Sequence, residues 1–461
     1  MYPGRRLWRA CGCRIRGSAV GLRCILVKVM LNMTSFSGLN LMAPLMKAVE
    51  SEGYSTPTPI QLKSIPHLLG GRDLMGLAQT GTGKTAAFTL PMLQRLTESG
   101  NPSQRNSPRA LILAPTRELA GQIADSIRTY GKHLKLRSGV AYGGVSIRSQ
   151  INMLSSGLDV LVATPGRLLD LMNQGHCRLG RIEIFVLDEA DRMLDMGFIP
   201  DVRRIAAKLP AIRQTALFSA TMPETVLKLA AGLLTDPIRV EAAPAATTVE
   251  KVDQRVFFVP KDKKSDLLSK LLTNSDIKRV LIFTRTKHGA NKVALHLDRE
   301  GVSSGAIHGN KSQAARQKVL GEFKSGRLRA LVATDIAARG IDVNGITHVI
   351  NFDLPNEPES YVHRIGRTAR AGASGVAISF CDSEERAFLR DIEKTIRRSV
   401  LVDENHPYHG MAPAPANDRG GMPGRSRFKS NRPPRRSGGR SGQSSHGGHS
   451  GHGGQARRPA A

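Results

Sequence analysis

Cysteine, acidic residues and long apolar runs are all scarce in this chain of 461 residues. The five cysteines form no CxxC pair, so we expect neither a zinc ribbon nor a disulfide framework, and a reducing environment suits the sequence. No uninterrupted apolar run reaches about 18 residues, which excludes a membrane-spanning helix. Apolar residues still make up 40% of the chain, enough for the cores of two or three domains. We therefore expect a cytoplasmic protein with no membrane partner.

The shortage of acids leaves a strongly basic chain, with 67 lysines and arginines, 38 acids and a formal net charge of +29. Nucleic acid is the commonest acidic partner of such a protein. The charge is uneven, because residues 1–32 hold seven basic residues and no acid, and residues 405–461 hold ten and a single acid. Both ends therefore differ from the moderately basic middle of the chain.

The C-terminal end, residues 403–461, is rich in Gly, Ser, Pro and Arg and offers little that could be buried. We therefore expect a disordered tail. Its basic composition favours a sequence-independent RNA tether over a merely solubilising role. His446, His449 and His452 could hold a metal, but a Gly-rich tail spaces them loosely, so we do not expect a metal site.

The N-terminal end, residues 1–32, is a basic extension that we also expect to be disordered. It could be an organelle targeting segment, or Met33 or Met30 could be the true start of the protein. The second possibility is favoured, because a recognisable domain begins near Met33.

Short apolar runs alternate with amphipathic stretches through the middle of the chain. The runs span residues 110–114, 160–163, 182–187, 280–283 and 331–333. Runs this short, separated by helical patterns, indicate buried parallel strands in βαβ units. Residues 241–250 (EAAPAATTVE) lack large apolar side chains and are expected to form a linker. The predicted fold class is α/β, with two tandem parallel-sheet domains at residues 33–240 and 251–402.

A phosphate-binding loop is predicted at Ala78–Thr85 (AQTGTGKT), which has the required strand, Gly-rich loop and helix context. Gly81 and Gly83 would let backbone N–H groups close around phosphates. Lys84 would supply positive charge to them, and Thr85 a hydroxyl to Mg²⁺. The loop residues predicted to bind ATP are Ala78, Gln79, Thr80, Gly81, Thr82, Gly83, Lys84 and Thr85. A Gly-rich turn that merely caps a helix is the weaker alternative.

The acidic motif Asp188–Asp191 (DEAD) follows the strand-like run IEIFVL, which places a carboxylate where doubly wound sheets bind ligands. Asp188 would hold Mg²⁺, directly or through water, and Glu189 would orient and deprotonate the attacking water. An acidic helix N-terminus favoured by the helix dipole is the alternative. We expect Met193 and Met196, on the helix that follows, to pack in the core.

These motifs and those around them resemble the DEAD-box ATP-dependent RNA helicases of superfamily 2 across residues 33–402. In family order the chain carries GYSTPTPIQ, APTRELA, a GG pair, TPGR, SAT, LIFTRT, QAAR, TDIAARGID and HRIGRTARAG. The resemblance implies two tandem RecA-like domains, with ATP and Mg²⁺ as cofactors and RNA as the partner. The compact core and the basic Gly/Arg-rich tail further resemble the bacterial RhlE-type subgroup.

The resemblance also implies roles for individual residues. The Q motif and its partners would contact adenine and ribose through Phe36, Gln61, Arg339 and Asp342. The catalytic residues would be Lys84, Asp188, Glu189, Arg367 and Arg370, the last two as arginine fingers. The coupling residues would be Asp191, Ser219, Thr221 and His363. RNA would be held by Pro115, Thr116, Arg117, Gly143, Gly144, Thr164, Pro165, Gly166, Arg167, Gly309, Gln313, Arg316 and Thr334.

The expected function is ATP-driven closure of two domains on RNA, which unwinds short duplexes or remodels RNA–protein complexes. Contacts to the RNA backbone carry no sequence code, so binding should be sequence-independent. Three alternatives stay open: a DNA helicase, a non-catalytic RNA clamp, and an RNA chaperone whose activity lies in the tail. A ribosomal precursor and an RNA-degradation complex are both compatible partners, and the pattern indicates no oligomeric state. The one departure from the family pattern, Ala369 in place of a common glycine, is expected to be tolerated.

Overall fold

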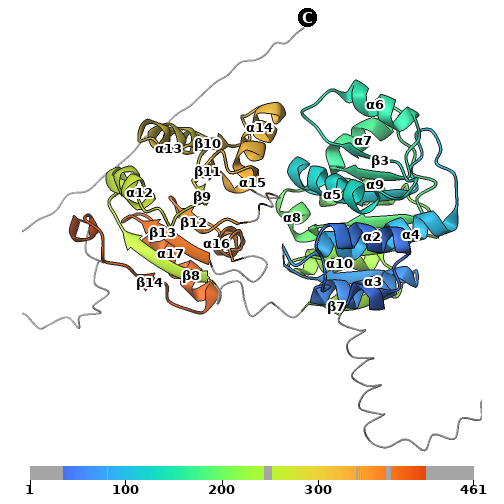
Figure 1. The fold of residues 1–461 in the computed structure, drawn as a ribbon, viewed down its shortest axis with the longest axis horizontal. Coiled ribbons are helices and arrows are strands. Elements are labelled where there is room, and N and C mark those ends of the chain that lie inside the picture. The colour runs from blue at the N-terminus through green and yellow to red at the C-terminus, as the bar shows by residue number, and fades with distance from the viewer. Residues whose placement is uncertain are drawn as a thin grey trace, which may run out of the picture. The chain divides into compact units, whose positions relative to one another are not determined.

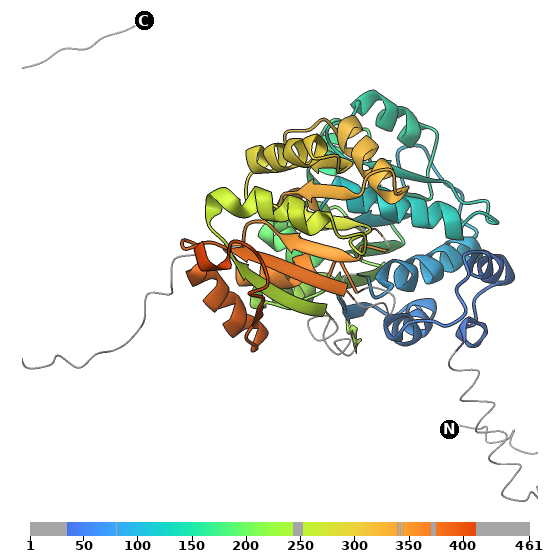
Figure 2. The ribbon, with the colours of Figure 1, turned by 60° about the vertical axis from the view of Figure 1, so that its left-hand side comes forward.

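The computed structural model describes residues 35–79, 81–242, 252–338, 341, 343, 345–369 and 375–411. These residues form two α/β lobes within one compact unit. Each lobe takes up one continuous stretch of the chain, blue to green for residues 35–242 and yellow to red for residues 252–411 (Figures 1 and 2). In the described part of the chain, no helix is both long and apolar enough to cross a membrane.

Each lobe is built on a seven-stranded sheet whose strands all pair in parallel, in the orders β3-β4-β2-β5-β6-β1-β7 and β10-β11-β9-β12-β13-β8-β14. The first sheet contains β1 (Leu74–Leu77), β2 (Ala110–Leu113), β3 (Ser138–Ala141), β4 (Val160–Ala163), β5 (Ile184–Leu187), β6 (Gln214–Ser219) and β7 (Ile238–Glu241). The second contains β8 (Val252–Phe258), β9 (Val280–Phe283), β10 (Ser304–Ile307), β11 (Ala330–Ala333), β12 (His348–Asn351), β13 (Gly375–Cys381) and β14 (Leu401–Val402). The predicted α/β class with two parallel-sheet domains is confirmed.

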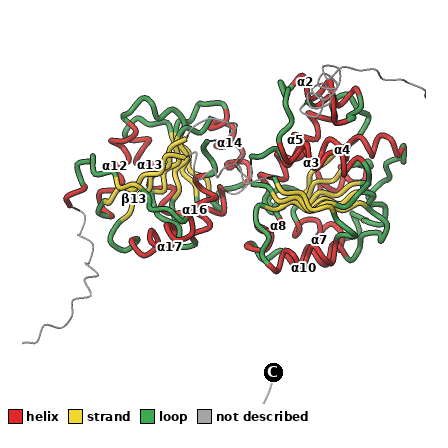
Figure 3. Tube along the Cα trace, turned by 90° about the horizontal axis from the view of Figure 1, so that it is seen from below, coloured by secondary structure: helices red, strands yellow, loops and turns green. Residues whose placement is uncertain are grey.

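Helices cover both faces of each sheet, which explains why the central strands are apolar and buried throughout. The first lobe contains η1 (Phe36–Leu39), α2 (Ala43–Ser51), α3 (Pro59–Leu69), α4 (Lys84–Ser99), α5 (Arg117–Tyr130), α6 (Ile147–Ser155), α7 (Pro165–Asn173), α8 (Ala190–Asp195), α9 (Ile199–Ala206) and α10 (Glu224–Leu233). The second contains η2 (Lys261–Lys263), α12 (Lys264–Leu272), α13 (Lys287–Arg299), α14 (Gln313–Lys324), α15 (Asp335–Ala338), α16 (Pro358–Ile365), α17 (Arg386–Ile396) and η3 (His409–Met411). In the first lobe, α2 to α5 pack on one face and α6 to α10 on the other (Figure 3).

The sequence motifs gather at one edge of each sheet. The phosphate-binding loop follows β1, the APTRELA and TPGR motifs follow β2 and β4, and the DEAD motif follows β5. In a parallel sheet all carboxyl ends lie at the same edge, where such folds bind ligands. In the first lobe the fold therefore brings together residues that are about a hundred positions apart, such as Lys84 and Asp188.

The second lobe continues past the boundary that we expected at residue 402. The backbone N–H of Asp403 donates to the carbonyl of Val256 at 3.0 Å, which extends the pairing of β14. The ring of His406 stacks on Phe257 with centroids 5.1 Å apart, and Lys270 lies over the Tyr408 ring at 4.9 Å. Residues 403–411 are therefore part of this lobe, while the rest of the tail, the basic N-terminal extension and residues 243–251 lie outside the described residues.

Candidate functional site

A cavity of about 380 Å³ lies at the carboxyl edge of the first sheet, a size typical of small-ligand sites. It brings together nine of the residues predicted to act on ATP: Phe36, Gln61, Gly81, Gly83, Lys84, Thr85, Asp188, Glu189 and Arg367. Four predicted residues, Thr80, Arg339, Asp342 and Arg370, lie outside the described part of the chain. Ala78, Gln79 and Thr82 shape the loop instead, since Lys84 Nζ donates to the Ala78 carbonyl at 2.9 Å and Thr82 Oγ1 to that of Gln79 at 2.7 Å.

Glycine is required at the point where the phosphate-binding loop enters α4. Gly83 has φ of +89°, in the left-handed region, and a Cβ there would lie 2.5 Å from Nε2 of Gln61. Gln61 in turn donates from Nε2 to the Gly83 carbonyl at 3.1 Å and accepts from the Thr58 N–H at 2.9 Å. Gln61 is thus fixed between the start of α3 and the loop, at the wall of the cavity.

The carboxylates of Asp188 and Glu189 are almost completely buried, with 2% exposure each. Glu189 precedes α8 with φ of +55°, in the left-handed region, where the backbone of a residue other than glycine is strained. Such strain is common at functional sites. Its Oε2 accepts from Nη1 of Arg192 at 2.9 Å, which fixes the carboxylate toward the cavity.

The pKa values of the two buried carboxyl groups shift in opposite directions, because their charged neighbours differ. Burial raises the pKa of Asp188, and the neighbouring Glu189 adds to this against the opposing charge of Lys84. Burial also disfavours the Glu189 anion, but Arg192, Lys84 and Arg367 outweigh it and hold that pKa below its ordinary value. Asp188 and Thr85 line the same cavity, and a carboxylate and a hydroxyl are oxygen ligands of the kind that Mg²⁺ prefers, so the two residues fit a Mg²⁺ ion.

The third acid of the motif, Asp191, does not line the cavity and joins β6 to α8. The Asp191 N–H donates to Ser219 Oγ at 3.1 Å, and Asp191 Oδ2 accepts from the Thr221 N–H at 2.9 Å and its hydroxyl at 3.0 Å. Burial opposes the Asp191 anion, yet Lys84 and these hydrogen bonds hold its pKa below the ordinary value. Three of the four predicted coupling residues therefore form one network.

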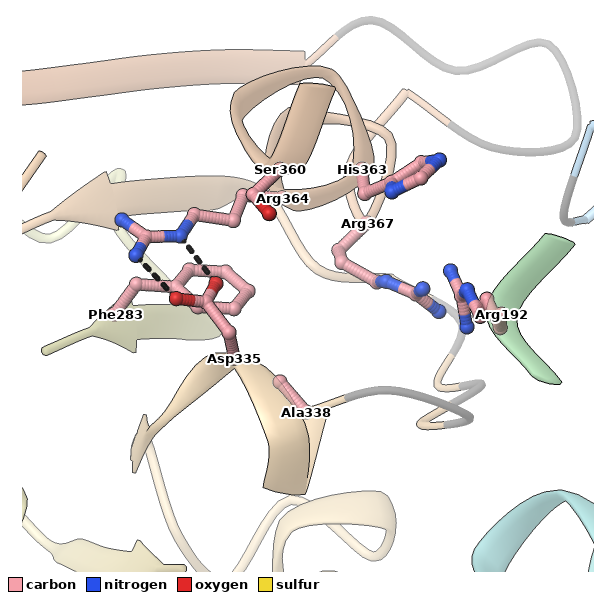
Figure 4. A pocket seen from close by; sticks show the side chains of 8 residues that line it. All are labelled: Arg192, Phe283, Asp335, Ala338, Ser360, His363, Arg364 and Arg367. Carbon is pink, nitrogen blue, oxygen red and sulfur yellow. Dashed lines mark hydrogen bonds and ion pairs between the residues drawn. The ribbon is translucent and has the colours of Figure 1, made fainter. Parts of the chain in front are cut away.

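The fourth, His363, lies on α16 and lines a small cavity with Arg192, Arg364 and Arg367 (Figure 4). The guanidinium groups of Arg192 and Arg367 face one another there, an arrangement that an anion would stabilise. Arg364 had no predicted role. Its Nε and Nη2 donate to the two carboxylate oxygens of Asp335, both at 2.6 Å, and this bidentate pair fixes the helix that positions His363 and Arg367.

A second cavity, of about 390 Å³, contains nine of the thirteen residues predicted to bind RNA: Pro115, Thr116, Arg117, Gly143, Thr164, Gly166, Arg167, Gly309 and Arg316. We call this cavity the groove. Helices α5, α7 and α14 all begin at or near it, and helix N-termini favour phosphate. Gly144 is outside the lining but makes room for it, since a Cβ at its φ of +81° would collide with the Arg117 guanidinium.

The other three predicted RNA residues lie elsewhere. Pro165 is buried at the start of α7, and Thr334 precedes α15 away from the groove lining. Gln313 is buried and donates from Nε2 to Glu118 Oε1 at 3.2 Å. Glu118, for which no role was predicted, also pairs with Arg316 at 3.0 Å, so it joins α5 of the first lobe to α14 of the second.

The structure adds residues to both cavities that sequence reasoning missed. Tyr54 lines the nucleotide cavity with 45% exposure, whereas the predicted Phe36 is 3% exposed and packs in the core. Tyr54 directly follows the glycine of GYSTPTPIQ, which is the signal that could have identified it.

The two methionines that we expected in the core, Met193 and Met196, differ in their surroundings. Met193 is fully buried in the core as expected, but Met196 is half-buried and lines the groove, so the expectation that it packs in the core was wrong.

Ala369 has φ of +54°, where a side chain costs about 1–2 kcal/mol, which explains why glycine suits this position.

Known protein families resemble this chain in both of its lobes. A family model described as DEAD/DEAH box helicase matches residues 58–229, and one described as helicase conserved C-terminal domain matches residues 263–372. The chain is 44% identical over 368 residues to DEAD-box ATP-dependent RNA helicase CshA of Bacillus cereus, which covers 80% of this chain and 69% of the relative. It is 45% identical over 368 residues to ATP-dependent RNA helicase DeaD of Escherichia coli, covering 80% of this chain and 58% of that protein.

Solved structures share the fold of both lobes. Dbp5 of S. cerevisiae bound to RNA and ADP BeF3 is 34% identical, with a TM-score of 0.71. The match covers 80% of this chain and 96% of that one.

Proposed function

We propose residue roles for this chain, which belongs to the family of DEAD-box ATP-dependent RNA helicases. The protein is an enzyme with two tandem RecA-like domains that binds RNA and ATP and couples ATP hydrolysis to RNA unwinding or remodelling. The residue roles rest on one observation. Arg367 comes from the second lobe and lines the nucleotide cavity of the first lobe, beside Glu189.

The nucleotide is assigned to the cavity of about 380 Å³. The phosphates would lie against the backbone of Gly81 and Gly83, with the charge of Lys84 beside them. The GYSTPTPIQ segment serves as a Q motif, in which Gln61 hydrogen-bonds to adenine. Tyr54 rather than Phe36 offers an exposed aromatic face for the base. Thr80, Arg339, Asp342 and Arg370 keep the roles implied by the family motifs.

Mg²⁺ is assigned to Thr85 and Asp188, either directly or through water. When bound, the ion supplies positive charge to the phosphate oxygens. Asp188 contributes a buried carboxylate for it, and the hydroxyl of Thr85 lines the same cavity.

Hydrolysis requires a positioned water and charge opposite the γ-phosphoryl group. Glu189 is held by Arg192, and its lowered pKa keeps it ionised, so it can accept a proton or hydrogen bond from the attacking water. Arg367 supplies the charge that an arginine finger provides, about 10³–10⁵ in rate. Because Arg367 belongs to the second lobe, hydrolysis depends on closure of the two lobes.

RNA is assigned to the groove. Arg117, Arg167 and Arg316 would hold phosphates together with the N-termini of α5, α7 and α14. The network of Asp191 with Ser219 and Thr221 would link the two sites, because it joins the helix that follows Glu189 to the end of β6.

We also propose a subgroup, domain bounds, a role for the tail, a target and a compartment for this protein. The chain falls in the RhlE-type subgroup, its domains span residues 33–240 and 251–402 or slightly beyond, and the basic tail tethers RNA. A ribosomal precursor or an RNA-degradation complex would be the target, and the compartment would be the cytoplasm.

The test of these roles is ATP hydrolysis by Arg367→Ala with saturating single-stranded RNA. We expect a fall in kcat of at least about 10³ with KM for ATP nearly unchanged, because the finger acts on the transition state. A matched control is Arg390→Ala, an exposed arginine on α17 that lines neither cavity, which should leave kcat unchanged. Equal kcat values for Arg367→Ala and the wild type would refute the role of Arg367.

A further inference from the structure

One wall of the groove is not explained by phosphate binding. Met196 and Phe198 line it, whereas most other lining residues are arginines, threonines and glycines. Phosphate oxygens gain nothing from a thioether or a phenyl ring, whereas covering these apolar surfaces with an apolar partner is favourable. The two side chains therefore offer an apolar surface beside the charged side chains of the groove.

The core does not account for Met196. Its neighbour Met193, three residues earlier, is completely buried in the core cluster behind the first sheet, while Met196 remains half-buried at the groove. Phe198 does both, since it packs partly against that core and also lines the groove. Met196 is thus the better probe of a binding role, because its replacement leaves the core intact.

A tight turn holds the pair in this position. Helix α8 ends with the Gly197 N–H donating to the Leu194 carbonyl at 2.9 Å and the Phe198 N–H to the Met193 carbonyl at 2.8 Å. Gly197 has φ of +73°, the left-handed conformation that closes many helices and that glycine adopts without strain. The turn sets one apolar side chain on each side of Gly197 against the groove.

We propose that Met196 and Phe198 form an apolar wall against which the sugar and base faces of a bound RNA strand pack. The arginines of the groove hold the phosphates of the same strand. Every base presents an apolar face, so such a wall adds affinity without sequence preference. This inference rests on the proposed assignment of RNA to the groove.

The test uses Met196→Gln in the full chain, because glutamine keeps the length of methionine and replaces its apolar end. We would measure ATP hydrolysis against the concentration of a single-stranded RNA of about ten nucleotides. We expect the half-stimulating RNA concentration to rise about three- to tenfold, since a lost contact of one or two methylene groups has that effect on affinity. ATP hydrolysis without RNA, KM for ATP and the unfolding temperature should stay unchanged.

Two further variants make the result specific. Phe198→Leu keeps an apolar side chain for the core but removes the flat ring, and should weaken RNA in the same direction. Ile212→Gln is the matched control, because Ile212 is 95% exposed and lies outside the groove lining. The control should leave RNA stimulation at the wild-type level.

Salt dependence separates the wall from the phosphate contacts. The slope of log affinity against log salt should be unchanged in Met196→Gln and smaller by about 0.7 in Arg167→Ala, which removes one phosphate contact to a single strand. Wild-type RNA dependence in both Met196→Gln and Phe198→Leu, with weakened binding in Arg167→Ala, would overturn the wall alone. A wild-type enzyme without any RNA stimulation would overturn both the wall and the assignment of RNA to the groove.

Discussion

Arg316 Nη2 of the second lobe lies 3.0 Å from Glu118 Oε1 of the first, and both side chains are largely shielded from water. The same oxygen accepts from Gln313 Nε2 at 3.2 Å, and Arg117 approaches Gln313 Oε1 at 3.5 Å. Glu118 thus draws together residues that were predicted only to hold RNA. Because residues of both lobes line the groove, we expect closure of the lobes to complete it.

Replacing Glu118 with Gln should therefore impair closure. The charge that pairs with Arg316 is lost, and a buried partner left without its counter-charge typically costs a few kcal/mol. We expect kcat with saturating RNA to fall about tenfold or more, while ATP hydrolysis without RNA changes little. Asp125→Asn, an exposed carboxylate on the same helix paired with Arg128, is the control and should have no such effect. Equal losses in the two variants would contradict a specific role for Glu118.

Glu189→Gln should uncouple binding from hydrolysis. Glutamine can still accept from Arg192 but no longer takes a proton from water, and loss of a general base typically lowers rate by about 10²–10⁴. We expect RNA to remain bound in the presence of ATP and to dissociate more slowly than from the wild type, which a filter-binding or anisotropy assay would measure. A variant that hydrolysed ATP like the wild type would show that Glu189 is not the base.

The base-binding face of the nucleotide cavity can be assigned by contrasting two aromatic residues. Tyr54→Ala should raise KM for ATP about tenfold with kcat retained, because an exposed stacking surface is lost, while Tyr54→Phe keeps the ring and should be nearly neutral. Phe36→Ala should instead destabilise the folded protein by about 3–5 kcal/mol, as expected for a buried ring. Steady-state kinetics and thermal unfolding measure the two effects. A raised KM in a stably folded Phe36→Ala variant, with none in Tyr54→Ala, would reverse the assignment.

The sequence predicted the sheets well because their strands are short apolar runs that are buried on both faces. Residues 160–163 and 280–283 coincide with β4 and β9, and the phosphate-binding loop enters α4 at Lys84 as its motif requires. These features can be predicted from local sequence, because each depends on neighbouring residues in the chain or on a motif with fixed spacing.

Contacts between distant segments were not predictable in the same way. Glu118 meets Arg316 across about two hundred residues, and nothing in APTRELA distinguishes it from a surface acid. Met196 has the helical spacing of a core residue, and only the turn at Gly197 directs it to the groove. The docking of residues 403–411 likewise depends on ring stacking between His406 and Phe257, which composition does not reveal.

That docking should depend on pH. Burial against the second lobe lowers the pKa of His406 below its ordinary value of 6.5, and the nearby His409 adds to the effect while Asp403 opposes it. The undocked segment therefore binds a proton more readily than the docked one. The stabilisation is fully present above about pH 6.5 and is lost as pH falls from there through the folded pKa.

Hydrogen exchange of residues 401–411 would measure this effect, with faster exchange expected at about pH 5.5 than at about pH 7.5 after correction for the intrinsic rate. His406→Phe keeps a ring to stack on Phe257 but cannot titrate, so its protection should not depend on pH. The same acid-induced loss of protection in His406→Phe would exclude His406 as the titrating group.

The most direct test of the whole account is steady-state ATP hydrolysis by the wild-type protein without nucleic acid, with single-stranded RNA and with DNA of matched sequence. Because Arg367 must reach the nucleotide cavity from the second lobe, hydrolysis should be slow until RNA helps to close the lobes. We predict strong stimulation by RNA and little by DNA, since the 2′-hydroxyl allows the two to be distinguished. Equal stimulation by both would favour a DNA-competent helicase, and no hydrolysis under any condition would contradict the assigned catalytic site.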